Sequence, residues 1–314
     1  MITRCGVASV AAMVVSAALT ACAGAQQRAD TSFDMSVKRP AHTARHPLLV
    51  IDEAHNNFHT ATGRYAPFAA LMRNDGYRVA PSAVTLTKVA LDSVGVLVIS
   101  NPAAPGIGAA GATSASAFTD AECDAVRDWV RAGGALLLIA DHAPFGSATE
   151  LLAGRFGVNF GKGFVHDTAH VLAGRGPTML VFDKERLGAH AIMNGRDSSE
   201  RIRTVVSFTG QSMSSPPGAT ALLRLSPTAG ESPTREDLAS LRGVSAAGRA
   251  QGIAMTFGRG RVVMLGEAAM MSAQLAAGAV DQYGAPFTMG MNHPGSDDKQ
   301  FALNVVRWLS RVLE

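Results

Sequence analysis

Histidine and carboxylate residues gather where apolar segments of this sequence end. Imidazole nitrogens and carboxylate oxygens are the ligands that zinc, manganese and iron accept in proteins. The sequence therefore predicts a site for a divalent metal such as zinc in one polar crevice. The predicted metal ligands are Asp52, His55, His59, Asp141 and His142.

The same residues allow a second interpretation without a metal. Asp52 and Asp141 would accept hydrogen bonds from helix amino termini or loop backbone, while the histidines would hydrogen-bond across the crevice. The spacing of His55 and His59 suits one face of a helix, but the two asparagines between them favour a loop. The sequence leaves both interpretations open.

Further polar residues at the same positions could move protons or bind a ligand. Glu53, Glu267 and His293 are the predicted residues for general acid–base catalysis. Amide side chains can both donate to and accept from a polar ligand. The predicted ligand-binding residues are Asn56, Asn57, Asn101 and Asn292.

The recognisable motifs do not include a nucleophile. The string Gly210–Ser214 lacks the final glycine of a nucleophile elbow, and Cys123 falls within a predicted amphipathic helix. No Lys-Ser or Lys-Thr follows the glycines of residues 258–260. We therefore expect a turn between strands there, and not a phosphate-binding loop.

The first half of the chain alternates continuous apolar runs with amphipathic segments. Continuous apolar runs are typical of parallel strands that helices cover on both sides. The alternation predicts an α/β fold with a doubly wound, mainly parallel sheet, in which ligands bind beyond the carboxyl ends of the strands. The predicted strands are residues 48–51, 77–80, 95–99 and 135–140, and the predicted helices are residues 64–74, 119–133 and 148–156.

The second half is less regular. The glycines of residues 258–260 predict a late antiparallel hairpin between strands at 252–257 and 261–265, and residues 226–249 look like an exposed excursion. Ser296-Asp297 is expected to cap a final helix. Further strands are predicted at residues 205–208 and 221–225.

The amino-terminal residues predict a lipoprotein leader. Arg4 precedes an apolar run too short for a comfortable membrane span, which ends in Leu19-Thr20-Ala21-Cys22. This order resembles a lipobox, so residues 1–21 would be removed as a signal peptide and Cys22 would carry the lipid. The alternative is an ordinary secretory leader cleaved nearby. By resemblance to sorted lipoproteins, Ala23 instead of Asp after the cysteine implies that the protein is anchored at the periplasmic face of the outer membrane.

The leader also sets the expected domain organisation. Residues 22–46 lack apolar periodicity and predict a flexible tether, and residues 47–314 predict the folded domain. Removal of Cys5 with the leader and lipidation of Cys22 would leave Cys123 alone, so no internal disulfide is expected. The net charge is only +3, with basic residues scattered singly, so we expect a membrane contact through the lipid but no nucleic-acid partner.

Four segments carry a resemblance to a known superfamily. Over most of residues 47–314 they resemble the class I glutamine amidotransferase-like superfamily, and most closely an uncharacterised bacterial branch related to trehalose-utilisation-type domains. His190–Gly195 is similar to a His-Pro-Ile-x-x-Gly element of that branch, with Ala191 in place of proline. The four segments are Val50–His55, the strand–helix–strand around Gly76-Tyr77, Trp129–Leu138 and Gly258–Val263.

The resemblance implies a flavodoxin-like fold without amidotransferase activity. The family's elbow cysteine and its His-Glu partners have no counterparts in this sequence, and fold by itself does not define function. One hypothesis is an envelope-anchored, metal-assisted hydrolase acting on a small molecule or carbohydrate. The other is a non-catalytic domain that binds a sugar, a cell-wall fragment or another protein. The missing nucleophile favours binding, and the density of histidines and carboxylates favours catalysis.

Overall fold

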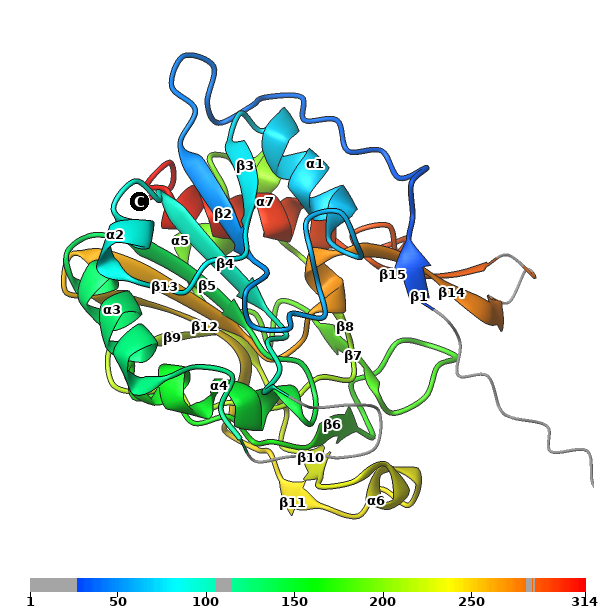
Figure 1. Ribbon diagram of the computed structural model, residues 1–314. Helices are drawn as coiled ribbons and strands as arrows, with labels where there is room; N and C mark the ends of the chain where they lie inside the picture. The colour runs from blue at the N-terminus through cyan, green and yellow to red at the C-terminus, as the bar shows by residue number, and fades with distance from the viewer. Residues whose placement is uncertain (1–26, 106–114, 281–283, 285) are drawn as a thin grey trace, which may run out of the picture.

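A central seven-stranded sheet with helices on both faces forms the body of the molecule (Figure 1). The structure is a computed structural model of the 314-residue chain and describes residues 27–105, 115–280, 284 and 286–314. The predicted signal peptide and Cys22 lie outside these residues. Within them, no helix combines the length and apolar character needed to cross a membrane.

Five parallel strands make up most of the sheet, in the spatial order β3-β2-β4-β5-β13. Numbered along the chain this order is 2-1-3-4-5, the order of flavodoxin-like sheets. Every residue of β4 and β5 is buried, which explains their unbroken apolar runs. The bounds are β2 Leu48–Asp52, β3 Arg78–Ser82, β4 Val96–Ser100, β5 Ala135–Ile139 and β13 Gly260–Leu265.

Two antiparallel strands complete the sheet. β12 (Ala250–Phe257) pairs with β13, which confirms the predicted hairpin, and β9 (Thr220–Arg224) pairs with β12 at the edge. The hairpin needs a glycine at Gly260, because a Cβ there would lie 2.0 Å from the carbonyl oxygen of Val130. The sheet is therefore mixed, with its antiparallel part formed by the late strands.

Helices cover the two faces in separate groups. On one face α1 and α7 pack against the sheet in one apolar cluster. On the other face the short α2 packs with α3 and α4 in a second cluster. The predicted helices are therefore present, with boundaries shifted by a few residues. Their bounds are α1 Ala66–Asn74, α2 Lys88–Leu91, α3 Asp120–Arg131, α4 Phe145–Gly154 and α7 Asp298–Leu309.

The amino termini of α3 and α7 are held differently. Thr119 accepts a hydrogen bond from the backbone N–H of Glu122, and the Glu122 carboxylate accepts one from the backbone N–H of Thr119. This reciprocal capping box fixes the start of α3. Asp297 is the N-cap residue of α7, as predicted, but its carboxylate accepts hydrogen bonds from the backbone of Arg203 and Thr204 and not from the helix.

Three small sheets flank the central one. The segment expected to be an exposed excursion is partly a folded element, because its strand β10 pairs with β6 and buries Glu231 and Ser232. The small sheets are β1-β14-β15, β11-β10-β6 and β7-β8. The remaining bounds are β1 Gln27–Ala29, β6 Phe164–Asp167, β7 Met179–Phe182, α5 Ala191–Asn194, β8 Val205–Phe208, β10 Ala229–Ser232, α6 Arg235–Ala239, β11 Val244–Ser245, β14 Ala273–Val280 and β15 Pro286–Gly290.

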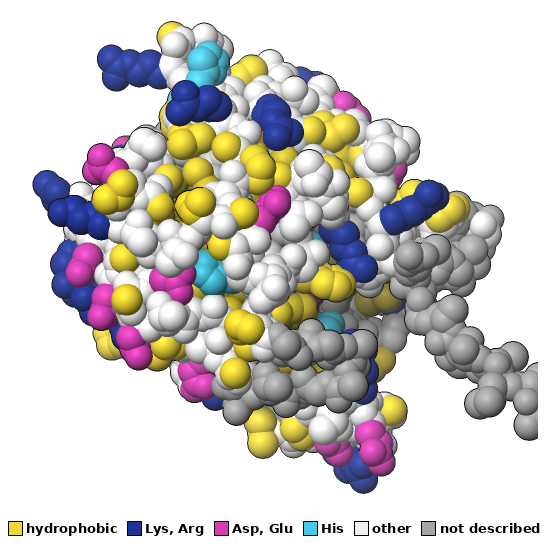
Figure 2. Space-filling model, viewed as in Figure 1, with side chains coloured by type: hydrophobic (Ala, Val, Ile, Leu, Met, Phe, Trp, Pro, Cys, Tyr) yellow, Lys and Arg dark blue, Asp and Glu magenta, His cyan; other side chains and the backbone are white. Residues whose placement is uncertain are grey.

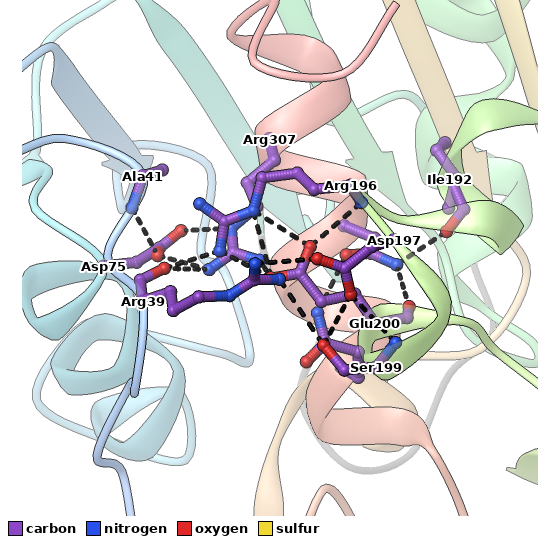
Figure 3. A network of polar contacts seen from close by, with 11 residues as sticks. Arg39, Ala41, Asp75, Ile192, Arg196, Asp197, Ser199, Glu200 and Arg307 are labelled. Carbon is purple, nitrogen blue, oxygen red and sulfur yellow. Dashed lines mark hydrogen bonds and ion pairs between the residues drawn. The ribbon is translucent and has the colours of Figure 1, made fainter.

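The amino-terminal segment is part of the fold from Gln27 onward, which corrects the predicted extent of the flexible tether. β1 pairs antiparallel with β14, where Gln27 lies opposite Ala276. Further along, Arg39 forms ion pairs with Asp197 at 2.7 Å and Glu200 at 3.0 Å (Figure 3). Polar contacts and strand pairing hold this segment, so apolar periodicity could not reveal it.

A buried arginine connects this segment to α7 (Figure 3). Arg307 is 1% exposed, forms an ion pair with Asp75 at 2.7 Å and donates a hydrogen bond to the backbone carbonyl of Arg39. The hydrogen bonds and charge of Asp75, together with the charge of Glu200, raise the pKa of Arg307 against the opposing effect of burial. The guanidinium therefore remains charged within the protein.

Candidate functional site

The carboxyl ends of β4, β5 and β13 border a cavity of about 690 Å³. The helix after β2 lies on one face of the sheet and the helix after β4 on the other, so the strand order reverses between these neighbours. Ligands of open α/β sheets bind at such a reversal, and small-molecule pockets occupy about 300–1,000 Å³. This cavity is therefore the candidate site.

Five of the residues predicted from the sequence line this cavity. They come from loops that follow β2, β4, β5 and β13, so the sheet topology brings together residues far apart in the chain. Aromatic and methionine side chains provide the apolar part of the wall. The five predicted residues are His59, Asn101, Asp141, His142 and Glu267.

His59 is a neutral group in the cavity wall. Its Nδ1 hydrogen-bonds Ser100 Oγ at 3.1 Å, and its ring stacks on Tyr65 with centroids 4.5 Å apart. Burial lowers the pKa of His59 to about 3, helped by the nearby positive charge of Arg64. His59 can therefore hydrogen-bond at neutral pH but carries no charge.

Glu267 is a fully buried carboxyl group in the cavity wall. Burial raises the pKa of Glu267 well above its usual value, and the charge of Asp141 raises it further. Hydrogen bonds from the backbone N–H groups of Ala269 (2.6 Å) and Met270 (2.8 Å) to its carboxyl oxygens oppose that rise. The protonated form of Glu267 is therefore favoured more than in an ordinary glutamate.

Asn101 and Asp141 shape the loops after β4 and β5. Asn101 adopts a left-handed backbone conformation with a φ of 47°, and its side chain accepts a hydrogen bond from the Asp141 backbone N–H at 2.8 Å. Asp141 in turn accepts a hydrogen bond from the backbone N–H of His142 at 2.7 Å. The His142 ring stacks on Phe164, with centroids 4.8 Å apart. These contacts fix the Asp141 carboxylate at the cavity.

Two arginines that the sequence reasoning did not select also line the cavity. Arg64 lies over the ring of Phe58 at 4.1 Å and donates a hydrogen bond to Gln27 at 3.4 Å, and burial lowers its pKa. Arg235 lies over the ring of Phe164 at 5.0 Å. Among the described residues, neither guanidinium is within 4 Å of an Asp or Glu oxygen.

Asp52 and His55 belong to a buried network outside the cavity. His55 Nδ1 is 2.9 Å from Asp52, and its Nε2 is 3.0 Å from Glu122, the residue of the α3 capping box. Burial lowers the pKa of His55, but the hydrogen bonds and charges of Asp52 and Glu122 together raise it further, so the net change is upward. Both ring nitrogens therefore already have partners.

Three other predicted residues stabilise the loop after β2. Glu53 accepts a hydrogen bond from the backbone N–H of Ala61 at 2.8 Å, and Asn57 accepts one from the backbone N–H of His55 at 3.0 Å. Asn56 has a left-handed backbone conformation with a φ of 48°. None of the three side chains lines the cavity, because the loop folds back on itself and uses them as internal partners.

Asn292 and His293 lie beside the small β1-β14-β15 sheet, away from the cavity wall. The Asn292 amide donates a hydrogen bond to Asp30 at 2.9 Å, and His293 Nδ1 is 3.0 Å from the carbonyl oxygen of Thr288. Burial lowers the pKa of His293, with the Arg175 charge acting in the same direction. The turn before α7 packs on this sheet, which separates both residues from the predicted crevice.

The predicted metal site is not assembled in the described part of the chain. There, no group of three or more His, Cys, Asp and Glu side chains is arranged to hold a metal ion. Both nitrogens of His55 contact carboxylates, and the Nδ1 atoms of His59 and His142 contact Ser100 and the Ala143 carbonyl. The predicted ligands thus lie in separate hydrogen-bond groups.

Neither candidate nucleophile is available for reaction. Cys123 is fully buried in α3, and burial raises the pKa of its thiol to about 12. Ser212 is also fully buried and donates its hydroxyl hydrogen to Glu231. The cavity itself therefore offers hydrogen-bonding groups, two acidic side chains and two cations.

The strand order and the strand-end cavity define a mixed α/β protein with a large, mostly parallel sheet. The mmIFT52 N-terminal domain is similar over 83% of this chain and 97% of that domain, with 15% identity and a TM-score of 0.57. At such identity the likeness concerns the fold alone.

Solved structures described as ThuA-like are also similar, at lower TM-scores. The similarity to the protein from Bacteroides uniformis covers 87% of this chain and 93% of that chain, with 15% identity and a TM-score of 0.41. The similarity to the protein from Parabacteroides merdae covers 84% of this chain and 90% of that chain, with 11% identity and a TM-score of 0.42. No protein-family model matches the chain, and no curated protein matches it by sequence.

Proposed function

We propose that this protein is a lipid-anchored, class I glutamine amidotransferase-like domain of the trehalose-utilisation type that has no amidotransferase activity. The 2-1-3-4-5 strand order and the sequence resemblance support the domain type. The Leu19–Cys22 string supports anchoring in the cell envelope, at the periplasmic face of the outer membrane. The buried state of Cys123 supports the absence of thiol chemistry.

Within this domain, the strand-end cavity binds a small, hydroxyl-bearing molecule that carries a carboxylate or phosphate, such as a sugar acid or a cell-wall fragment. The observation that carries this proposal is the presence of Arg64 and Arg235 in the cavity wall without an ion-pair partner among the described residues. Arginine binds carboxylate and phosphate through paired hydrogen bonds. Asn101 and Asp141 offer partners for hydroxyl groups.

Thermal unfolding of residues 23–314 with a ligand panel tests this proposal. The panel compares glucose with glucuronate, glucose 6-phosphate and N-acetylmuramic acid. A ligand at a hundred times its dissociation constant stabilises the folded state by about 2.7 kcal/mol. We expect the anionic molecules to raise the melting temperature more than glucose, and an equal response to all four would contradict the role of the arginines.

The substitution Arg64→Gln gives a sharper test. Loss of a charged hydrogen bond costs about 1.5–3 kcal/mol, which corresponds to roughly a 10- to 150-fold weaker affinity for the anionic ligand. Arg78→Gln is the matched control, because Arg78 is exposed on β3 and does not line the cavity. Affinity that is equally reduced by both substitutions would indicate a general charge effect instead of a specific contact.

Acid–base hydrolysis of the bound molecule is the second candidate function. The observation that favours it is the pairing of Asp141 with Glu267, whose pKa is raised by burial and by the Asp141 charge. A carboxyl group with a raised pKa can act as a general acid, and a second carboxyl group beside it can act as the base. Asp141→Asn should then abolish turnover of a ligand-derived glycoside or ester while leaving measurable binding. Unchanged turnover would exclude this function.

A further inference from the structure

Gln27 connects the cavity to the proposed lipid anchor. It lines the cavity, contacts Arg64 and is held in β1 by pairing with β14. It is only five positions after Cys22 in the sequence. A fully extended chain spans at most about 3.6 Å per residue, so Gln27 lies no more than about 18 Å from the lipidated residue.

This distance is short compared with the size of the domain. A folded chain of this length has a radius of gyration of about 19 Å and is therefore roughly 50 Å across. However the domain rotates about its anchor, the wall of the cavity that contains Gln27 remains within about 18 Å of the membrane surface. A ligand presented at that surface can thus reach the cavity without leaving the membrane.

The wall nearest the anchor has the chemistry of an anion-binding membrane contact. Arg64 contacts Gln27 and lies over Phe58, whose ring is 50% exposed at the cavity. Exposed aromatic rings suit the boundary between lipid and water, and arginine binds phosphate and carboxylate. Burial lowers the pKa of Arg64 because it disfavours the charged form, and a bound anion would stabilise that charged form.

We infer that the strand-end cavity takes an anionic, hydroxyl-bearing head group presented at the membrane surface. The inference rests on the proposed lipidation of Cys22 and on the proposed anion binding. An acidic phospholipid and a lipid-linked sugar acid share this chemistry, and so does a soluble polyol phosphate. The experiment therefore includes both a membrane arm and a soluble arm.

In the membrane arm, the full lipidated chain is reconstituted in vesicles of phosphatidylethanolamine and phosphatidylglycerol. A photoreactive benzoylphenylalanine replaces Phe58 in one variant and Val89 in the control. Val89 is 87% exposed on α2, at the opposite end of the molecule from β1 (Figure 1). We expect several-fold more phosphatidylglycerol adduct at position 58 than at position 89.

Lengthening the anchor provides the matched perturbation. A flexible Gly/Ser insertion of about 20 residues between Cys22 and Gln27 adds a root-mean-square reach of roughly 25 Å. The adduct at position 58 should then fall toward the level at position 89. Arg64→Gln in the short-anchor protein should reduce the phosphatidylglycerol adduct but not the phosphatidylethanolamine adduct, whereas Arg78→Gln should change neither.

The possible outcomes distinguish failure of this inference from failure of the proposed lipid anchoring and the proposed anion binding. Failure of the protein to float with vesicles would overturn the anchoring, and the inference with it. Flotation with equal adducts at both positions would overturn the inference alone. In the soluble arm, glycerol phosphate is added to the unlipidated protein. If it stabilises the protein while the vesicle adduct at position 58 stays at the control level, the cavity is assigned to a soluble ligand. That result would keep anion binding and overturn membrane presentation.

Discussion

The His55 network gives a quantitative prediction for stability. His55→Ala removes the shared partner of Asp52, which is fully buried, and of Glu122. Breaking a buried pair by removing one partner typically costs about 3–5 kcal/mol, because a charge is left buried without compensation. That loss is a large part of a typical free energy of unfolding of about 5–15 kcal/mol. A double variant with Asp52→Asn should recover part of the loss, because it removes the uncompensated charge.

The penalty should also depend on pH. The folded-state pKa of His55 is raised, so its stabilising contribution is fully present below the unfolded pKa of about 6.5 and is lost as pH rises through the folded pKa. The difference between wild type and His55→Ala should therefore be larger near pH 5.5 than near pH 8.5. Each tenfold increase in proton affinity on folding adds about 1.4 kcal/mol to that difference.

Urea unfolding at the two pH values measures both effects. Wild type, His55→Ala and the double variant are compared, with His46→Ala as a control at an exposed histidine. Comparing proteins at one pH cancels the contribution of other groups, such as His59, whose lowered pKa destabilises the fold in acid. A loss of unfolding free energy in His55→Ala below about 1 kcal/mol, or a loss that is equal at both pH values, would refute the reasoning.

Three further perturbations have defined outcomes. Arg307→Met should lower the free energy of unfolding by about 3–5 kcal/mol, measured in urea, because its buried carboxylate partners lose their cation; an effect below about 1 kcal/mol would contradict this. Cys123 should resist a thiol reagent in the native protein and react fully after unfolding, since burial raises its pKa to about 12. Gly260→Ala should lower the melting temperature because of the clash with Val130, and an unchanged melting curve would show that the hairpin can relax.

The parallel part of the fold could be predicted from sequence because its signals are local. Unbroken apolar runs mark the strands, and the Thr119–Glu122 pattern marks the start of α3. In the small sheets only β8 is predicted from the sequence, at residues 205–208, because its apolar run is continuous. β1 and β6 pair with segments far away in the sequence, which no local pattern reveals. Asp297 shows the limit of local sequence patterns. It occupies a position typical of helix caps, but its carboxylate binds the backbone of a neighbouring loop.

The candidate site could be predicted in part for the same reason. Residues directly after buried strands, such as Asn101 and Asp141, reach the cavity because topology brings strand ends together. The sequence cannot tell which polar residues in a loop face the cavity and which hold the loop, and Asp52 and His55 contact each other without lining the cavity. Arg235 comes from a flanking element whose position depends on tertiary pairing.

The pairing of β1 with β14 bears on the order of events during biogenesis. Gln27 lies opposite Ala276, so its partner strand is made only when most of the chain has been synthesised. Contacts of such long sequence separation form late, after the cost of closing a large loop has been met. Until then Gln27–Ala29 have no strand partner. Completion of this small sheet therefore places Gln27 in the cavity wall only late in folding, so that wall is finished after the central parallel sheet has formed.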